Sequence, residues 1–115
     1  MPAPDRDAAI VRHILQYCSE VEIAHADFGT SKERFLASST YRNAISMPIL
    51  QIGELANHLS ADFREKHKSI PWRQIIATRN FYAHEYHAID IDLVWATSLE
   101  DIQALKGFCS QYLKQ

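Results

Sequence analysis

A chain of 115 residues with 47% hydrophobic residues is long enough for one compact domain over residues 1–115 and too apolar for a disordered chain. Its net charge of −2 is not that of a general nucleic-acid binder, although it allows an enzyme that contacts a few phosphates locally. Gly and Pro are scarce, which favours helices over turn-rich β architectures. The chain shows neither a secretory signal nor a run of about 18 apolar residues that could span a membrane, so we expect a cytoplasmic protein.

Apolar residues recur at spacings of three and four along most of the chain, and this pattern predicts helices and no strand. The first helix is expected over residues 5–26, with Gly29 just beyond its end. The stretch from Thr30 to Glu33, TSKE, then predicts a capping box that opens a short helix over residues 31–38.

A second long helix is expected over residues 40–59, where an apolar stripe continues. Pro48 lies inside this helix and should kink it, because proline removes one backbone donor and crowds the carbonyl four residues earlier. Gly53 follows about a turn later and would allow either close packing or further bending. Ser60 then caps a short helix over residues 61–67.

Pro71 suits the first turn of a further helix, which runs into residues 78–86. The last helix should start at Asp90 or Asp92, and its apolar stripe has Ser98 as the one polar member. The His residues outside the 78–86 stretch are scattered and are expected to be structural or solvated. The chain is therefore predicted to be all-α, with four principal helices that pack most simply as an up-and-down bundle.

Residues 78–86, TRNFYAHEY, gather an unusual set of polar and aromatic side chains. A zinc site is not expected here, because the HExxH motif places its two His four residues apart, whereas His84 and His87 are three apart. An acid–base site fits better. A His can take the proton of an RNA 2′-OH or donate one to the leaving oxygen, and the fork of Arg79 can hold the phosphate.

No metal or other cofactor is required for this chemistry, and Asn80 could orient either group through its amide. Arg79 and His84 are five residues apart, so on a continuous helix they would point about 140° away from each other. They can meet at one phosphate only if the helix loosens before His84 or if a second subunit completes the site. A single protomer should therefore be a poor catalyst.

The residues from Arg79 to Tyr86 match the pattern Rx4HxY, and with this motif the chain resembles the HepT-like toxins of the HEPN superfamily. The likeness extends to the stretches ILQIGELANHLS (49–60), IPWRQIIATRNFYAHEY (70–86) and IDLVWATSLEDIQALK (91–106), so it covers most of the chain. It implies a HEPN-type four-helix bundle with short extra helices, and a homodimer whose site is a cleft at the dimer interface.

The resemblance also implies an activity and a partner. Such proteins are metal-independent ribonucleases that act as the toxin of a type VII toxin–antitoxin system. The motif Arg and His are catalytic, which implies Arg79 and His84, and the polar residue after the Arg, here Asn80, commonly supports the site. Tyr86 corresponds to the tyrosine to which the cognate minimal nucleotidyltransferase antitoxin attaches AMP to silence the toxin.

Each of these residues also has a structural interpretation that does not involve a ribonuclease site. Arg79 could be an exposed residue in a surface ion pair, His84 could cap carbonyls at a helix end, and Tyr86 could be an ordinary half-buried aromatic. Glu54 could be a site residue near the cleft or a solvated charge. The run REKHKS (64–69) is usually a solvated face but could steer an RNA backbone. The protein could also be a non-catalytic HEPN module that docks a nucleotidyltransferase or a nucleotide, or a structural helical oligomer.

Overall fold

The computed structural model describes residues 5–84 and 90–114, with the backbone alone for residues 80–84, and every regular element within these ranges is a helix. In chain order they are α1 (Arg6–Phe28), α2 (Lys32–Ala37), α3 (Ser39–Asn57), α4 (Ala61–Lys66), α5 (Trp72–His84), α6 (Ile91–Ala96), the π-helical turn η2 (Thr97–Asp101) and α7 (Ile102–Leu113). The predicted all-α fold is confirmed, and the two long N-terminal helices end within two residues of their expected ends.

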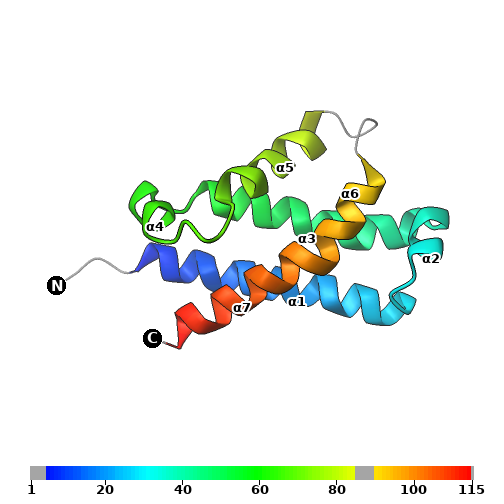
Figure 1. Cartoon of the computed structure of the whole chain (residues 1–115), viewed down its shortest axis with the longest axis horizontal. Coiled ribbons are helices and arrows are strands. Elements are labelled where there is room, and N and C mark those ends of the chain that lie inside the picture. The colour runs from blue at the N-terminus through cyan, green and yellow to red at the C-terminus, as the bar shows by residue number, and fades with distance from the viewer. Residues whose placement is uncertain (1–4, 85–89, 115) are drawn as a thin grey trace.

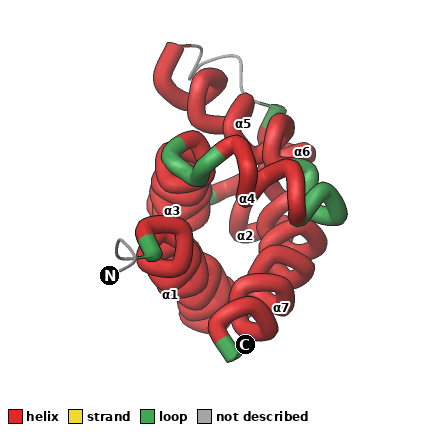
Figure 2. Tube along the Cα trace, turned by 90° about the vertical axis from the view of Figure 1, so that its left-hand side faces the viewer, coloured by secondary structure: helices red, strands yellow, loops and turns green. Residues whose placement is uncertain are grey.

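Four helical rods alternate in direction, as expected for an up-and-down bundle (Figure 1). The fourth rod is composite, because α6, η2 and α7 follow one another without a break. Helix α1 packs against α3 and α7, and α3 packs against α1 and α5. Helix α5 lies beyond α3, on the side away from α1 and α7 (Figure 2). The helix that carries the Rx4HxY motif is therefore the outermost of the four and rests mainly on α3.

Side-chain caps set the starts of the helices. Ser60 accepts a hydrogen bond from the amide of Phe63, so this predicted cap is confirmed. Of the two residues predicted to start the last helix, Asp90 is the cap, because its side chain accepts from the amides of Asp92 and Leu93. The predicted cap at Thr30 is wrong, because Ser31 is the residue that caps α2. Thr30 instead completes the end of α1: its φ of 48° follows the left-handed Gly29, and its hydroxyl donates to the carbonyl of His25.

Aliphatic and aromatic side chains fill the core, most of them from α1, α3 and α7, with Phe35 of α2, Phe63 of α4, Trp72 of α5 and Val94 of α6. The largest of the fully buried ones are Tyr41, Phe35, Ile14, Ile45 and Ile52. Pro48 is also buried, and α3 runs through it without interruption. Among the described helices, none combines the length and the hydropathy that a membrane crossing needs.

A buried histidine joins three of the elements. His25 of α1 contacts the Tyr41 hydroxyl through Nδ1 at 2.6 Å and the Ser98 hydroxyl through Nε2 at 2.9 Å. The Ser98 hydroxyl donates its own proton to the Trp95 carbonyl at 2.7 Å, so it accepts from His25 Nε2–H. Nδ1 is then the acceptor for the Tyr41 hydroxyl. The imidazole is neutral, and the network ties α1 to α3 and to η2.

This network explains why one polar residue interrupts the apolar stripe of the last helix. Ser98 is buried within η2, where its hydroxyl accepts a hydrogen bond from a buried histidine. His25 is thus one of the structural histidines that the sequence predicted, although its partners come from positions 16 and 73 residues away. Burial lowers the pKa of His25 below its ordinary value, because the charged form would lose its hydration.

The lowered pKa of His25 predicts a stability that falls with acidity. Below about pH 6.5 the unfolded chain protonates His25, whereas the folded protein resists protonation until the pH reaches the lowered value. The network's contribution is therefore complete above that window and is lost through it. We expect wild-type protein to lose more stability between about pH 7.5 and about pH 5.5 than His25→Gln, which keeps hydrogen-bonding groups but does not titrate. Urea unfolding across this range measures the difference, and equal pH slopes in the two proteins would contradict it.

Candidate functional site

The motif arginine is held by a carboxylate from the neighbouring helix. Arg79 of α5 donates from Nε to Oε1 of Glu54 on α3 at 2.5 Å. Both side chains are partly exposed, at 29% for Arg79 and 45% for Glu54. The sequence leaves Glu54 as either a site residue near the cleft or a solvated charge, and the structure places its partly exposed carboxylate against the motif arginine.

At Gly53, the residue before Glu54, α5 lies close against the backbone of α3. A Cβ built on Gly53 would lie 2.8 Å from the Cβ of Arg79 and 3.0 Å from the carbonyl oxygen of Ile75. Neither of these atoms is the end of a flexible side chain, so any larger residue would push the helices apart. Of the two roles expected for Gly53, the structure shows close packing. Adjacent residues of α3 thus set both the position of Arg79 and the direction of its side chain.

The geometry of the ion pair leaves the outer part of the guanidinium for a ligand. The bond to Glu54 uses Nε and does not occupy the two terminal nitrogens. Their N–H groups form a planar fork that matches two oxygens of a phosphate. An arginine that is anchored at Nε and partly exposed to solvent can therefore present this fork to an anion in a fixed orientation.

His84 ends the same helix that carries Arg79. Residues 72–84 form one helix, so the structure does not support a loosening of the chain before His84. Five residues on a continuous helix are separated by about 140° of rotation and about 7.5 Å of rise. Arg79 and His84 could meet at one phosphate through a loosened helix or through a second subunit. Because the helix is continuous, only the second subunit remains compatible with this backbone. The structure describes only the backbone of Asn80 and His84, and not their side chains.

Two further sequence predictions fall outside the described residues. Tyr86 belongs to the range 85–89, and so does His87 of the HEYH stretch. Among the side chains that are described, no three His, Cys, Asp or Glu groups gather in a way that could hold a metal ion.

The model of the family described as "Ribonuclease HepT-like" matches residues 10–112. The chain belongs to this family. The match includes the whole of α3 and α5, and with them Gly53, Glu54 and Arg79.

Individual relatives carry ribonuclease names. The "Putative RNase TTE0752" of Caldanaerobacter subterraneus subsp. tengcongensis is 32% identical over 105 residues, which are 91% of this chain and 92% of the relative. The "Probable ribonuclease HepT" of Thermococcus cleftensis is 35% identical over 75 residues, which are 65% of this chain and 68% of the relative. No solved structure matches the chain. Ribonuclease activity is thus supported at the level of the HepT-like family.

Two glycine substitutions should have opposite effects on stability. Gly53→Ala places a methyl group against Arg79 and the backbone of α5, so it should destabilise the fold by about 1–3 kcal/mol and move Arg79 away from Glu54. Gly107→Ala in α7 meets nothing within 4 Å and should stabilise by about 0.5–1 kcal/mol, because alanine favours a helix interior. Chemical denaturation of both variants tests the pair, and a Gly53→Ala protein as stable as wild type would show that α5 does not depend on this contact.

Proposed function

We propose that the protein is a metal-independent ribonuclease, the toxin of a type VII toxin–antitoxin system, which cuts RNA with Arg79 and His84 and is silenced by AMP attached to Tyr86. Family membership supports the ribonuclease. The structural observation that supports a phosphate site, beyond family membership, is the anchored arginine: Glu54 holds Nε of Arg79 at 2.5 Å and does not occupy its terminal nitrogens.

The proposed reaction uses the nucleophile that RNA itself provides. The 2′-oxygen bonds to phosphorus as the bond to the 5′-oxygen breaks, which leaves a cyclic phosphate on one product. His84 takes the 2′-OH proton or protonates the leaving 5′-oxygen, since the pKa of an unperturbed histidine lies near neutrality. The Arg79 fork stabilises the charge that builds on the phosphate oxygens. Asn80 would orient one of these groups, and no metal takes part.

We propose that a homodimer assembles this site. One helix separates Arg79 and His84 by about 140°, so a second α5 that faces the first would bring the two kinds of residue together. The outer position of α5 supports this arrangement (Figure 2). So does an apolar groove of about 390 Å³ between α5 and the α6–α7 rod, whose wall includes Ile75, Val94 and Leu93. Leu93 is 63% exposed in the single chain and would be covered by a partner copy.

Silencing would follow from charge and volume. A cognate minimal nucleotidyltransferase antitoxin would transfer AMP to the Tyr86 hydroxyl, seven residues after Arg79. The new phosphodiester is negatively charged and bulky, so it would repel the RNA phosphate and occupy the space that RNA needs. The guanidinium of Arg79 could pair with the new phosphate instead of the substrate.

The rival proposal is a HEPN module that docks a nucleotidyltransferase or a nucleotide without cutting RNA. The anchored Arg79 favours neither proposal by itself, because both would use it to bind a phosphate. Cleavage that depends on His84 separates them, since a binding module has no need of an acid or a base.

A metal-free cleavage assay tests the function directly. Wild-type dimer in EDTA should cut single-stranded RNA, and His84→Ala should lower the rate by roughly 10²–10⁴-fold because it removes the acid–base group. Arg79→Ala should cost roughly 10²–10³-fold because the building charge loses its partner. Light scattering should show that both variants remain dimers. An unmodified wild-type dimer, verified by intact mass to carry no AMP, that leaves RNA uncut would refute the nuclease and favour the binding module.

Glu54→Gln should separate orientation from binding. The substitution keeps the shape of the side chain but removes the charge that fixes Nε of Arg79, so we expect kcat to fall roughly ten- to hundredfold. RNA affinity should be equal or higher, because a negative charge beside the phosphate has gone. Glu20→Gln on the exposed side of α1 is the matched control and should change neither quantity. A parallel loss of affinity and kcat would show that Glu54 supports the fold and does not orient Arg79.

A further inference from the structure

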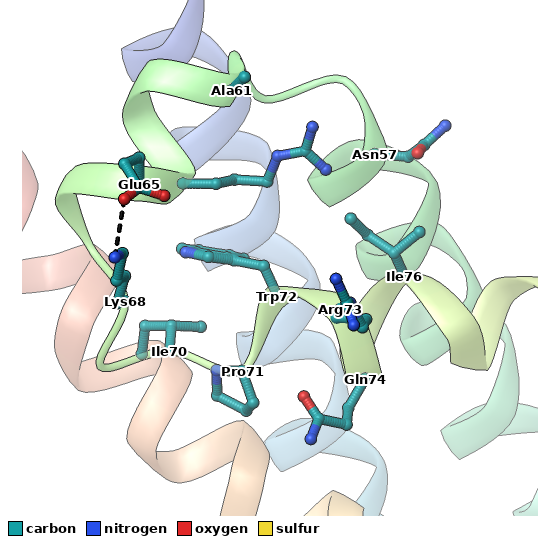
Figure 3. A pocket seen from close by; sticks show the side chains of 11 residues that line it. Asn57, Ala61, Glu65, Lys68, Ile70, Pro71, Trp72, Arg73, Gln74 and Ile76 are labelled. Atoms are coloured by element: carbon teal, nitrogen blue, oxygen red, sulfur yellow. Dashed lines mark ion pairs between the residues drawn. The ribbon is translucent and has the colours of Figure 1, made fainter.

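A second feature that could contact RNA lies at the start of α5. A groove of about 600 Å³ is walled by α4, by the connection to α5, by the first turn of α5 and by Asn57 at the end of α3 (Figure 3). Its wall carries three cations, Arg64, Lys68 and Arg73, and one carboxylate, Glu65. The groove thus has a surplus of positive charge in a chain whose net charge is −2.

The two arginines carry this surplus. Lys68 pairs with Glu65 at 2.7 Å, as the dashed line in Figure 3 shows. Within the described part of the chain, neither Arg64 nor Arg73 forms an ion pair. An arginine without a carboxylate partner beside an open groove keeps its full charge and its fork for an anion.

The start of α5 holds the groove in shape. Pro71 precedes the helix, and the first amide of the helix, that of Trp72, donates to the carbonyl of Ile70 at 2.8 Å. Trp72 is buried, and its indole N–H donates to the His67 carbonyl at 3.0 Å. Its ring is therefore part of the core and does not stack on a base, so the groove offers contacts to phosphates and not a base-stacking platform.

The groove opens on the same line of contact between α3 and α5 as the anchored arginine. Asn57 and Ile76 line the groove, whereas Glu54 and Arg79 lie three residues further along α3 and α5, in opposite chain directions. Three residues of helix correspond to about 4.5 Å, so the groove borders the Arg79 site within about one turn of each helix. A strand whose phosphate sits at Arg79 can place a neighbouring phosphate in the groove.

We propose that this groove binds backbone phosphates of the RNA strand on one side of the phosphate to be cut, with Arg64 and Arg73 as the ligands. The inference rests on the proposed ribonuclease site, whose substrate it extends. Because phosphates carry no sequence information, the groove supplies affinity and register along the strand and not base preference.

The test measures RNA binding without cleavage. His84→Ala protein is titrated with a labelled single-stranded RNA of about twelve nucleotides at several salt concentrations. Adding Arg64→Gln and Arg73→Gln should weaken binding roughly tenfold or more at low salt. The dependence of log K on log salt should become less steep by about 1.4, because about 0.7 is lost for each phosphate contact. The matched control adds Arg12→Gln in α1 and Arg34→Gln in α2, two arginines that form no ion pair within the described part of the chain. Helix α2 lies at the opposite end of the bundle from α4 (Figure 1).

A dinucleotide substrate adds an internal control in protein that retains His84. It spans only the phosphate to be cut, so the groove substitutions should leave its kcat/KM unchanged while they lower that of the longer RNA. Equal losses of affinity in the groove and control variants would overturn the inference, and so would RNA binding that the groove substitutions leave unchanged. Failure of the His84→Ala protein to bind RNA would overturn it as well.

The experiments distinguish a failure of the proposed groove from a failure of the proposed nuclease. A wild-type protein that does not cut RNA, but whose binding depends on Arg64 and Arg73, would support the groove and refute the nuclease. A wild-type protein that cuts RNA, with an affinity that ignores both arginines, would support the nuclease and refute the groove.

Discussion

The close approach of α3 and α5 at Gly53 is the constraint on which the rest of the site depends. Helix α5 rests mainly on α3, so this contact sets where the whole motif helix lies. Because no Cβ fits between Gly53 and Arg79, the backbone of α5 lies near enough for Glu54 to reach the arginine. A separation larger by the width of a methyl group would leave Arg79 free to adopt other rotamers, and the phosphate fork would lose its fixed direction.

The sequence predicts well those features, such as helix caps, that depend only on residues close together in the chain. Ser60 and Asp90 are caps because their oxygens bond amides within the next three residues, and such local signals are visible in the chain. Thr30 shows the limit of such signals. Ser31 beside it also carries a hydroxyl, and the left-handed turn through Gly29 and Thr30 puts the cap at Ser31 instead of the predicted Thr30. Position along the chain alone does not reveal where that turn ends.

The sequence could not predict which side chains pair between helices, because such pairs depend on how the helices pack against one another. Glu54 and Arg79 are 25 residues apart, and nothing in either segment specifies that their helices meet at that level. The His25 network likewise joins residues of α1, α3 and η2. Ser98 was the one visible sign of it, since a hydroxyl in an apolar stripe needs a buried partner, but the sequence could not say that the partner is a histidine.

Low net charge and RNA binding are compatible when the positive charge is concentrated in one place. The chain carries more carboxylates than Lys and Arg together, which argues against binding along its whole surface. Yet, among the described residues, neither Arg64 of α4 nor Arg73 of α5 forms an ion pair, and Arg79 lies further along α5. Glu54 neutralises part of the charge of Arg79, so under the proposed function Arg79 binds an anion in the ground state more weakly than the groove does. An RNA strand held mainly by the groove would bind only weakly at Arg79 in the ground state. The interaction with Arg79 would then strengthen as negative charge builds on the phosphate in the transition state, and an interaction of that kind accelerates the reaction.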